Sequence, residues 1–255
     1  MNPLLMPVVA AQAVYLRLST ETLPAAGGPE SGTADETVGA PAGEPAGEPA
    51  GERAGAAAGG AAGAGPLRIA VVGESTAAGC GVERHEDGFT GQFARELSAR
   101  TGRPVDWAVR GRYGATARRI RYRLVPELET GLHVAALLAG VNDVLTRRSP
   151  QDWGDDLAAV VGELAQRADQ VLVTGIPAFG EFPSIPKTLG RYLGERAAVL
   201  DEVAQRVCSG VQGVTWVAST NVLPMGPDFF ARDRFHPSAQ GYREWAQVVA
   251  GKVAL

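Results

Sequence analysis

The chain has 255 residues, of which 45% are hydrophobic and 20% charged, and its formal net charge is −4. This composition allows one large domain or two small ones with a real hydrophobic core, and nothing in the charge balance points to a nucleic-acid partner. Cys80, Cys208 and three dispersed histidines match neither a disulfide framework nor a zinc-binding spacing, so we expect no structural metal and no cofactor.

Residues 1–23 form a weakly apolar N-terminal segment. Residues 3–16 carry no charged side chain, but they are too few to span a membrane, which takes about 20 apolar residues. Ala11-Gln12-Ala13 has the form of a signal-peptidase site, yet no Lys or Arg precedes it, as a secretory signal requires. We therefore expect the segment either to touch a membrane or to dock on the domain as a short helix, and a cytoplasmic location is favoured.

Residues 24–66 are of low complexity and rich in Gly, Ala, Pro and Glu. A four-residue repeat is visible over residues 43–54, and residues 56–65 consist of Ala and Gly alone. Such a sequence has almost no apolar surface to bury and cannot offset the entropy that ordering costs. We predict a disordered linker here, followed by a folded domain over residues 67–255.

The folded domain alternates between short apolar segments and amphipathic ones. The predicted strands are 67–73, 105–109, 134–138, 170–174 and 215–218. The predicted helices are 89–100, 116–124, a segment capped by Ser149, 186–207 and a segment capped by Ser238. Because strands that are apolar on both faces indicate a parallel sheet covered on both sides, we predict an α/β fold. It should be a three-layer, flavodoxin-like sandwich with a central five-stranded parallel sheet and helices on both faces.

Three of the predicted strands are followed by residues suited to nucleophilic catalysis, and such loops meet at the carboxyl ends of parallel strands. Ser75 follows the first strand, where a small residue in a turn exposes its hydroxyl and leaves its own N–H free. Gly114 follows the second strand and can point an N–H at a ligand. Asn142 follows the third strand, and its side-chain amide can donate to an oxyanion. The alternatives are a plain strand-to-helix turn for Gly114 and an Asn-Asp turn for Asn142.

The loop before the last predicted helix contains Asp233 and His236, three residues apart. One turn of chain can bring the Asp233 carboxylate to one ring nitrogen of His236 while the other nitrogen faces a nucleophile. This arrangement would set the tautomer of the ring and stabilise the imidazolium. The alternative is a loop histidine that is bonded to a nearby carboxylate without a catalytic role.

The order of these residues along the sheet resembles that of the SGNH hydrolases, the GDSL-like esterases and lipases named for Ser, Gly, Asn and His in four sequence blocks. The matching segments are Gly73-Glu74-Ser75, Gly114-Ala115-Thr116, Gly140-Val141-Asn142-Asp143 and Asp233 to His236. The resemblance covers residues 67–255. Glu74 stands where the family usually has Asp, and Val109 and Tyr113 stand where its second block commonly has Asn and Ser.

The resemblance implies a serine hydrolase that cleaves carboxylic esters through an acyl-enzyme intermediate. Ser75 would be the nucleophile, His236 its base and Asp233 the residue that orients the base. The backbone N–H groups of Ser75 and Gly114, with the amide of Asn142, would form the oxyanion hole.

The expected partner is a small-molecule or lipid-like ester. Apolar residues within 179–186 and 223–230 are candidates for the wall of an acyl pocket, or they only cover the edge of the sheet. The arginines of the Arg110–Arg123 region, like the N-terminal segment, are candidates for a weak contact with a membrane; the alternative is a solvated helix face.

Two other functions stay open on the sequence. A flavodoxin-like nucleotide binder would hold phosphate in the Gly-rich turn after the first strand, although residues 73–81 lack both G-x-G-x-x-G and the P-loop lysine. A non-catalytic binding module on the same fold would account for the departures at Glu74 and Tyr113.

Overall fold

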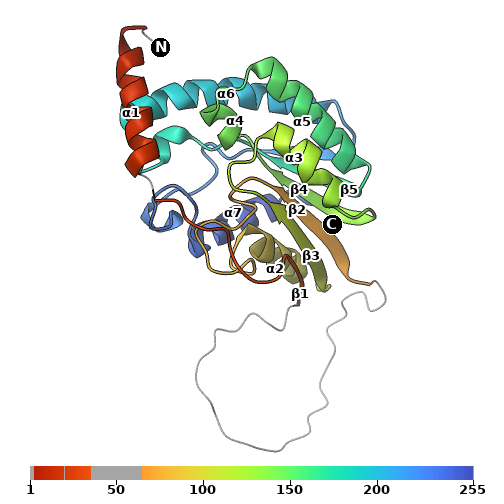
Figure 1. The fold of residues 1–255 in the computed structure, drawn as a ribbon. Helices are drawn as coiled ribbons and strands as arrows, with labels where there is room; N and C mark the ends of the chain where they lie inside the picture. Colours follow the sequence, from red (N-terminus) through yellow and green to blue (C-terminus); the bar gives the residue numbers. More distant parts are fainter. Residues whose placement is uncertain (1–2, 20, 36–64, 255) are drawn as a thin grey trace, which may run out of the picture.

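The computed structural model describes residues 3–19, 21–35 and 65–254. Within these residues the strands form one six-stranded sheet of order β1-β3-β2-β4-β5-β6 (Figure 1). They are β1 (Ser31–Ala34), β2 (Leu67–Gly73), β3 (Val105–Gly111), β4 (Leu132–Leu138), β5 (Ala168–Thr174) and β6 (Val214–Val217). Neighbouring strands from β2 to β6 pair in parallel, which confirms the predicted five-stranded parallel sheet.

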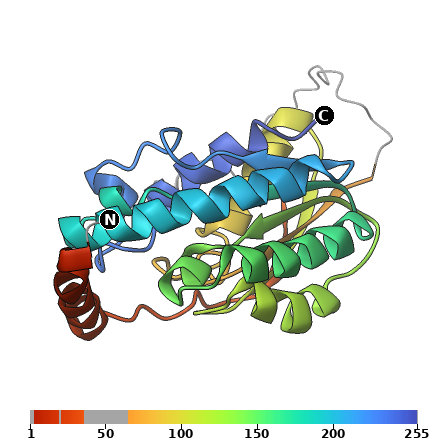
Figure 2. The same cartoon turned by 90° about the horizontal axis from the view of Figure 1, so that it is seen from above.

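Helices cover both faces of this sheet, so the three-layer prediction is also confirmed (Figures 1 and 2). The helices α2 (Phe89–Thr101) and α7 (Ala239–Ala250) pack on one face. On the other face lie α3 (Ala117–Arg123), α5 (Pro150–Ala165) and α6 (Lys187–Ser209), and the short helix α4 (Val141–Leu145) follows β4. Ser149 and Ser238 cap α5 and α7 as predicted, because each hydroxyl accepts a backbone N–H three residues further on.

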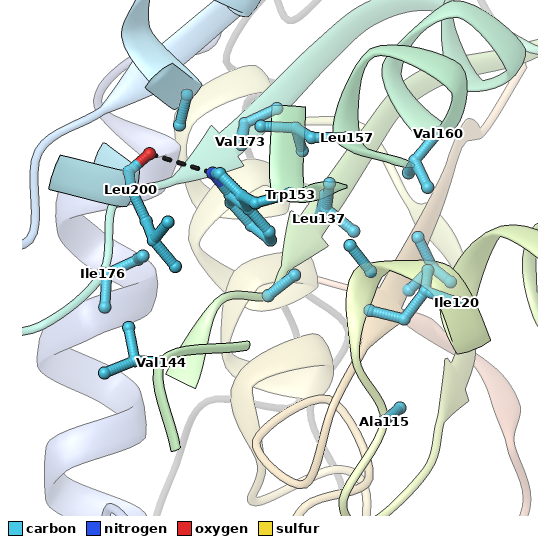
Figure 3. Close-up of a cluster of buried hydrophobic side chains, with 14 of the residues drawn as sticks. Ala115, Ile120, Leu137, Val144, Trp153, Leu157, Val160, Val173, Ile176 and Leu200 are labelled. Atoms are coloured by element: carbon cyan, nitrogen blue, oxygen red, sulfur yellow. Dashed lines mark hydrogen bonds between the residues drawn. The ribbon is translucent and has the colours of Figure 1, made fainter. Parts of the chain in front are cut away.

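Trp153 lies at the centre of the core on the α5 and α6 side of the sheet (Figure 3). Its side chain is 1% exposed and packs among aliphatic residues that include Leu157 and Val173. The indole Nε1 donates to the carbonyl oxygen of Leu200 at 2.9 Å. One buried residue of α5 therefore ties that helix to α6 as well as to the sheet.

The N-terminal segment forms helix α1 (Met6–Ser19), preceded by a short turn of 3₁₀ helix at Pro3–Leu5. It packs beside α6 (Figure 1), where Val9 is buried and the N–H of Leu189 donates to the side-chain oxygen of Gln12 at 2.9 Å. Of the two expectations for this segment, the docked helix is the one that the structure contains. No helix in the described part of the chain is both long and apolar enough to cross a bilayer.

The linker predicted over residues 24–66 was wrong at its start. Residues Ser31–Ala34 form β1, which pairs antiparallel with the edge of β3, so that Ser31 lies opposite Ala108. Gly32 allows this approach, because a Cβ there would lie 2.8 Å from the ring of Trp107. Composition misses such a strand because its stability comes from a neighbouring backbone and hardly from its own side chains. The repeat and the Ala/Gly stretch of the predicted linker fall among residues 36–64, outside the described residues.

Candidate active site

Ser75 lies in the loop directly after β2, at the carboxyl end of a central strand. The loop closes into a turn in which the N–H of Cys80 donates to the carbonyl oxygen of Ser75 at 3.0 Å. Gly111, at the end of β3, lies under this turn, and a Cβ there would be 2.1 Å from the backbone nitrogen of Ala78. Glycine at this position therefore lets the Ser75 loop rest directly on the neighbouring strand.

His236 is in hydrogen-bond contact with Ser75. Its Nε2 lies 2.9 Å from the Ser75 Oγ, and its Nδ1 lies 2.6 Å from Oδ2 of Asp233. The turn between them is held by Asp233 Oδ1, which accepts the backbone N–H groups of Phe235 and His236, both at 3.0 Å. These bonds stabilise a loop in which Arg234 adopts a left-handed φ of 59°.

The charge on Asp233 follows from the same contacts. Burial alone would raise the pKa of the carboxyl, but the hydrogen bonds from the His236 side chain and from the Phe235 backbone outweigh it and hold the pKa below its ordinary value. Asp233 is therefore ionised at neutral pH. A carboxylate must be ionised if it is to orient an imidazole and stabilise its protonated form.

Two of the backbone N–H groups expected to bind an oxyanion belong to residues that line one groove, Ser75 and Gly114. Within the described residues, no hydrogen bond takes up the N–H of Ser75 or of Gly114. Gly114 has a left-handed φ of 69°, a conformation that glycine adopts without strain. Both residues line the same groove as His236, together with Tyr113, whose ring lies 6.2 Å from the His236 ring. Tyr113, one of the departures from the family pattern, is thus at the site.

Asn142 also lines this groove, but its amide already has partners. Its Nδ2 donates to Oε2 of Glu74 at 2.7 Å and to the carbonyl oxygen of Ala115 at 3.1 Å. To donate to an oxyanion, the amide would have to release or share one of these bonds. The oxyanion role of Asn142 stays a prediction.

Glu74 is a site residue whose part the sequence left open. The residue is 3% exposed, and its carboxyl accepts the backbone N–H groups of Val141 at 3.3 Å and Asn142 at 3.1 Å, besides the Asn142 amide. Burial raises the pKa of Glu74 to about 8, since these hydrogen bonds offset the loss of solvation only in part. The side chain joins the loop of the nucleophile to the loop of Asn142.

A small, largely apolar cavity of about 40 Å³ lies beside Ser75 and His236. Its apolar wall includes Phe182, Leu223, Met225, Phe229 and Phe230. These residues come from the two segments that the sequence marked as candidates for an acyl pocket.

An open groove of about 770 Å³ begins at the same two residues. Helix α1 supplies one of its walls, which the sequence did not predict. The only signal for it is the uncharged stretch over residues 3–16.

The described residues contain no group of three or more His, Cys, Asp or Glu side chains arranged to hold a metal ion. Cys80 and Cys208 are free thiols in the interior, and burial raises the pKa of Cys80 to about 11 and that of Cys208 to about 12. Neither thiol has the lowered pKa of a reactive cysteine.

Comparison with known proteins relates this geometry to a family. The model of the GDSL-like lipase/acylhydrolase family matches residues 71–244, a range that includes Ser75, Asp233 and His236 and leaves α1 outside. A GDSL-like esterase of Mycobacterium tuberculosis is 26% identical over 182 residues, which make up 69% of this chain and 58% of the relative. The chain thus spans little more than half the length of that relative.

Solved structures share the fold. A lipase/acylhydrolase from Enterococcus faecalis superposes with a TM-score of 0.56 at 21% identity, over 73% of this chain and 94% of its own. An alpha/beta hydrolase from the metagenome of Lake Arreo gives a TM-score of 0.57 at 18% identity, over 75% of this chain and 98% of its own. At these identities the likeness concerns the fold alone.

Proposed function

The chain belongs to the GDSL-like lipase/acylhydrolase family, and from this premise we propose that it hydrolyses carboxylic esters through an acyl-enzyme on Ser75. The observation that carries the proposal is a pair of contacts around one imidazole. The His236 Nε2 lies 2.9 Å from the Ser75 Oγ while the Nδ1 lies 2.6 Å from the Asp233 carboxylate. A hydroxyl, a base and an orienting anion that are hydrogen-bonded in this order form the general arrangement of an activated serine.

In the proposed mechanism, His236 Nε2 takes the proton of Ser75 as the Oγ attacks the ester carbonyl carbon. Ionised Asp233 holds the ring through Nδ1–H and stabilises the imidazolium. The N–H groups of Ser75 and Gly114 donate to the oxyanion, and the amide of Asn142 joins them by giving up one present partner. The imidazolium then protonates the leaving alcohol oxygen as the carbon–oxygen bond breaks. Water, deprotonated by His236, attacks the acyl group and releases the acid and free Ser75.

The small cavity favours a short acyl group. On the measure by which one water needs roughly 10–15 Å³, the cavity of about 40 Å³ has space for about three groups of that size. Its aromatic and aliphatic wall suits an apolar chain. Acetyl and propionyl esters are therefore the substrates that we propose to test first.

Replacement of Ser75 by Ala tests the proposal on p-nitrophenyl acetate. We expect kcat/KM to fall by about a thousandfold or more, because the variant lacks the only hydroxyl in the described residues that is hydrogen-bonded to His236 Nε2. A fluorophosphonate probe should label the wild-type chain and leave the Ser75→Ala variant unlabelled. Ser209→Ala, a change on the surface of α6, is the matched control and should leave both readouts unchanged. Wild-type turnover by Ser75→Ala would exclude the mechanism, and an unlabelled wild-type chain would favour the non-catalytic binding module.

A further inference from the structure

Helix α1 contributes one face to the open groove that starts at Ser75 and His236. The contributing residues recur every three or four positions, so they share one side of the helix. They include Met6, Val9, Ala10, Ala13 and Val14. This part of the helix is uncharged, and Ala10 and Ala13 leave space where larger side chains would fill it; Arg17 and Glu21 place charges further along the groove.

Most of the remaining lining is also apolar. It comes from Val141 and Leu145 of α4 and from Leu189, Tyr192 and Leu193 of α6, while Asn142 and Arg147 add polar groups. Helix α1 is held against α6 by the buried side chain of Val9 and by the hydrogen bond from the Leu189 N–H to Gln12. The groove is therefore a formed feature of this chain, although one wall lies outside the segment that the family model matches.

Ser75, His236, Val141 and Phe235 line both the groove and the small cavity. A carbonyl carbon within reach of the Ser75 Oγ consequently has space on two sides, about 40 Å³ on one and about 770 Å³ on the other. An ester has two substituents, so one should occupy each space. The unequal volumes require one substituent to be short and allow the other to be long.

We propose that the α1 groove binds a long apolar alcohol portion of the ester, while the cavity holds a short acyl group. This inference rests on the proposed ester hydrolysis. The alcohol leaves first, when the acyl group is still bound to Ser75. An alcohol in the large groove can depart and admit water to the acyl-enzyme while the short acyl group stays in the small cavity. The substrate class is thus the short-chain acyl ester of a lipid-like alcohol.

Two isomeric esters test which substituent occupies which space. Hexyl acetate and ethyl hexanoate have the same atoms, but the long chain is the alcohol in the first and the acyl group in the second. We expect kcat/KM for hexyl acetate to exceed that for ethyl hexanoate by about tenfold or more. Lengthening the alcohol of an acetate should lower KM by roughly two- to fourfold per methylene while the chain remains in the groove. A preference for ethyl hexanoate would overturn the assignment.

The variant Ala13→Trp tests the role of α1 by filling the groove. We expect KM for hexyl acetate to rise by about tenfold, while kcat/KM for ethyl acetate stays within about twofold. The matched control is Ala11→Trp, the same change on an exposed position of the same helix that does not line the groove; it should leave both substrates unchanged. Equal effects of the two variants on hexyl acetate would overturn the proposal.

Binding without turnover separates this inference from the proposed function. In the Ser75→Ala background, calorimetric titration with hexyl acetate should give binding that Ala13→Trp weakens by about tenfold and Ala11→Trp does not. If this pattern holds but the wild-type chain hydrolyses no ester, the groove assignment stands and the catalytic proposal fails. If the wild-type chain hydrolyses esters but Ala13→Trp changes neither binding nor KM, the groove assignment fails alone.

Discussion

Glu74 is held by three hydrogen-bond donors and is nevertheless almost fully buried. Its donors are the backbone N–H groups of Val141 and Asn142 and the Asn142 amide. Burial raises the pKa of the carboxyl from 4.5 to about 8, so the folded chain keeps a proton there that the unfolded chain loses above pH 4.5. Since the native state binds more protons in this window, the free energy of unfolding falls as the pH rises from about 4.5 to about 8.

The variant Glu74→Gln should remove this pH dependence. Relative to that of the wild type, its free energy of unfolding should therefore increase with rising pH, by at most about 1.4 kcal/mol per unit between pH 5 and 8. Urea unfolding at pH 5.5, 6.5 and 7.5 measures the difference between the two proteins. A pH-independent difference in the free energy of unfolding is expected as well, because the Gln side chain would place an NH₂ group near N–H donors that the carboxyl of Glu74 accepts. A difference that does not change with pH would contradict a raised pKa at Glu74.

The contrast between His236 and Asn142 explains what could be predicted at this scale. Asp233 and His236 are three residues apart, so a single turn sets their contact, and the rule for strand ends brings Ser75 to the same edge. The partners of Asn142 depend instead on a contact with Glu74, 68 residues away in the sequence. Whether the Asn142 amide donates to Glu74 or faces the substrate depends on small differences in side-chain position. A sequence motif does not specify those positions.

At the scale of elements, the hydrogen bond from Trp153 to Leu200 links α5 to α6 (Figure 3). Trp153→Phe removes this donor, leaves a buried carbonyl oxygen with one partner fewer and opens a small cavity. We expect a loss of about 1–3 kcal/mol, which is roughly 3–10 °C in melting temperature for a domain of this size. Calorimetry measures it, with the exposed Gln151→Ala on the same helix as the control. An unchanged melting temperature would show that the link is not important for stability.

The elements that the sequence predicted well are those with their own periodic pattern. Helix α2 was expected at 89–100 and is Phe89–Thr101, and α6 was expected at 186–207 and is Lys187–Ser209. Their apolar residues recur at helical spacing and face the sheet. Strand β1 has no such pattern in Ser31–Ala34, because it is a strand only by virtue of its pairing with β3. Helix α1 is apolar on more than one side, so its pattern did not indicate which side would be buried.

At the scale of the whole molecule, the two regions expected to touch a membrane differ in what they present to solvent. Within the Arg110–Arg123 region, Arg110 pairs with Glu30 and Glu127, and Arg121 pairs with Asp156. Part of the positive charge visible in the sequence is therefore neutralised in the fold, and some of the neutralising residues are distant in sequence. An attraction to anionic lipid should consequently be weaker than the run of arginines predicts.

Helix α1 presents a different surface, beside the groove proposed for a lipid-like alcohol. Its outward side carries Val8, Tyr15 and Leu18, of which Leu18 is 81% exposed. Their spacing places them on one side of the helix. Exposed apolar side chains gain free energy when they enter a lipid surface, and here that surface would hold the substrate next to the groove. We therefore expect α1, rather than the arginines, to determine any contact with lipid.

Sedimentation with phosphatidylcholine vesicles measures this contact without relying on charge. We expect a fraction of the full chain to sediment with the vesicles and that fraction to be insensitive to salt, because apolar burial is not screened by ions. The double variant Tyr15→Ser and Leu18→Ser should reduce it several-fold, since each change removes exposed apolar area that would enter the lipid. The matched control, Arg119→Ser with Arg123→Ser, changes two exposed residues of the arginine-rich region and should leave the fraction unchanged. If the arginine pair weakens sedimentation and the α1 pair does not, the contact is electrostatic and this reasoning about α1 is wrong.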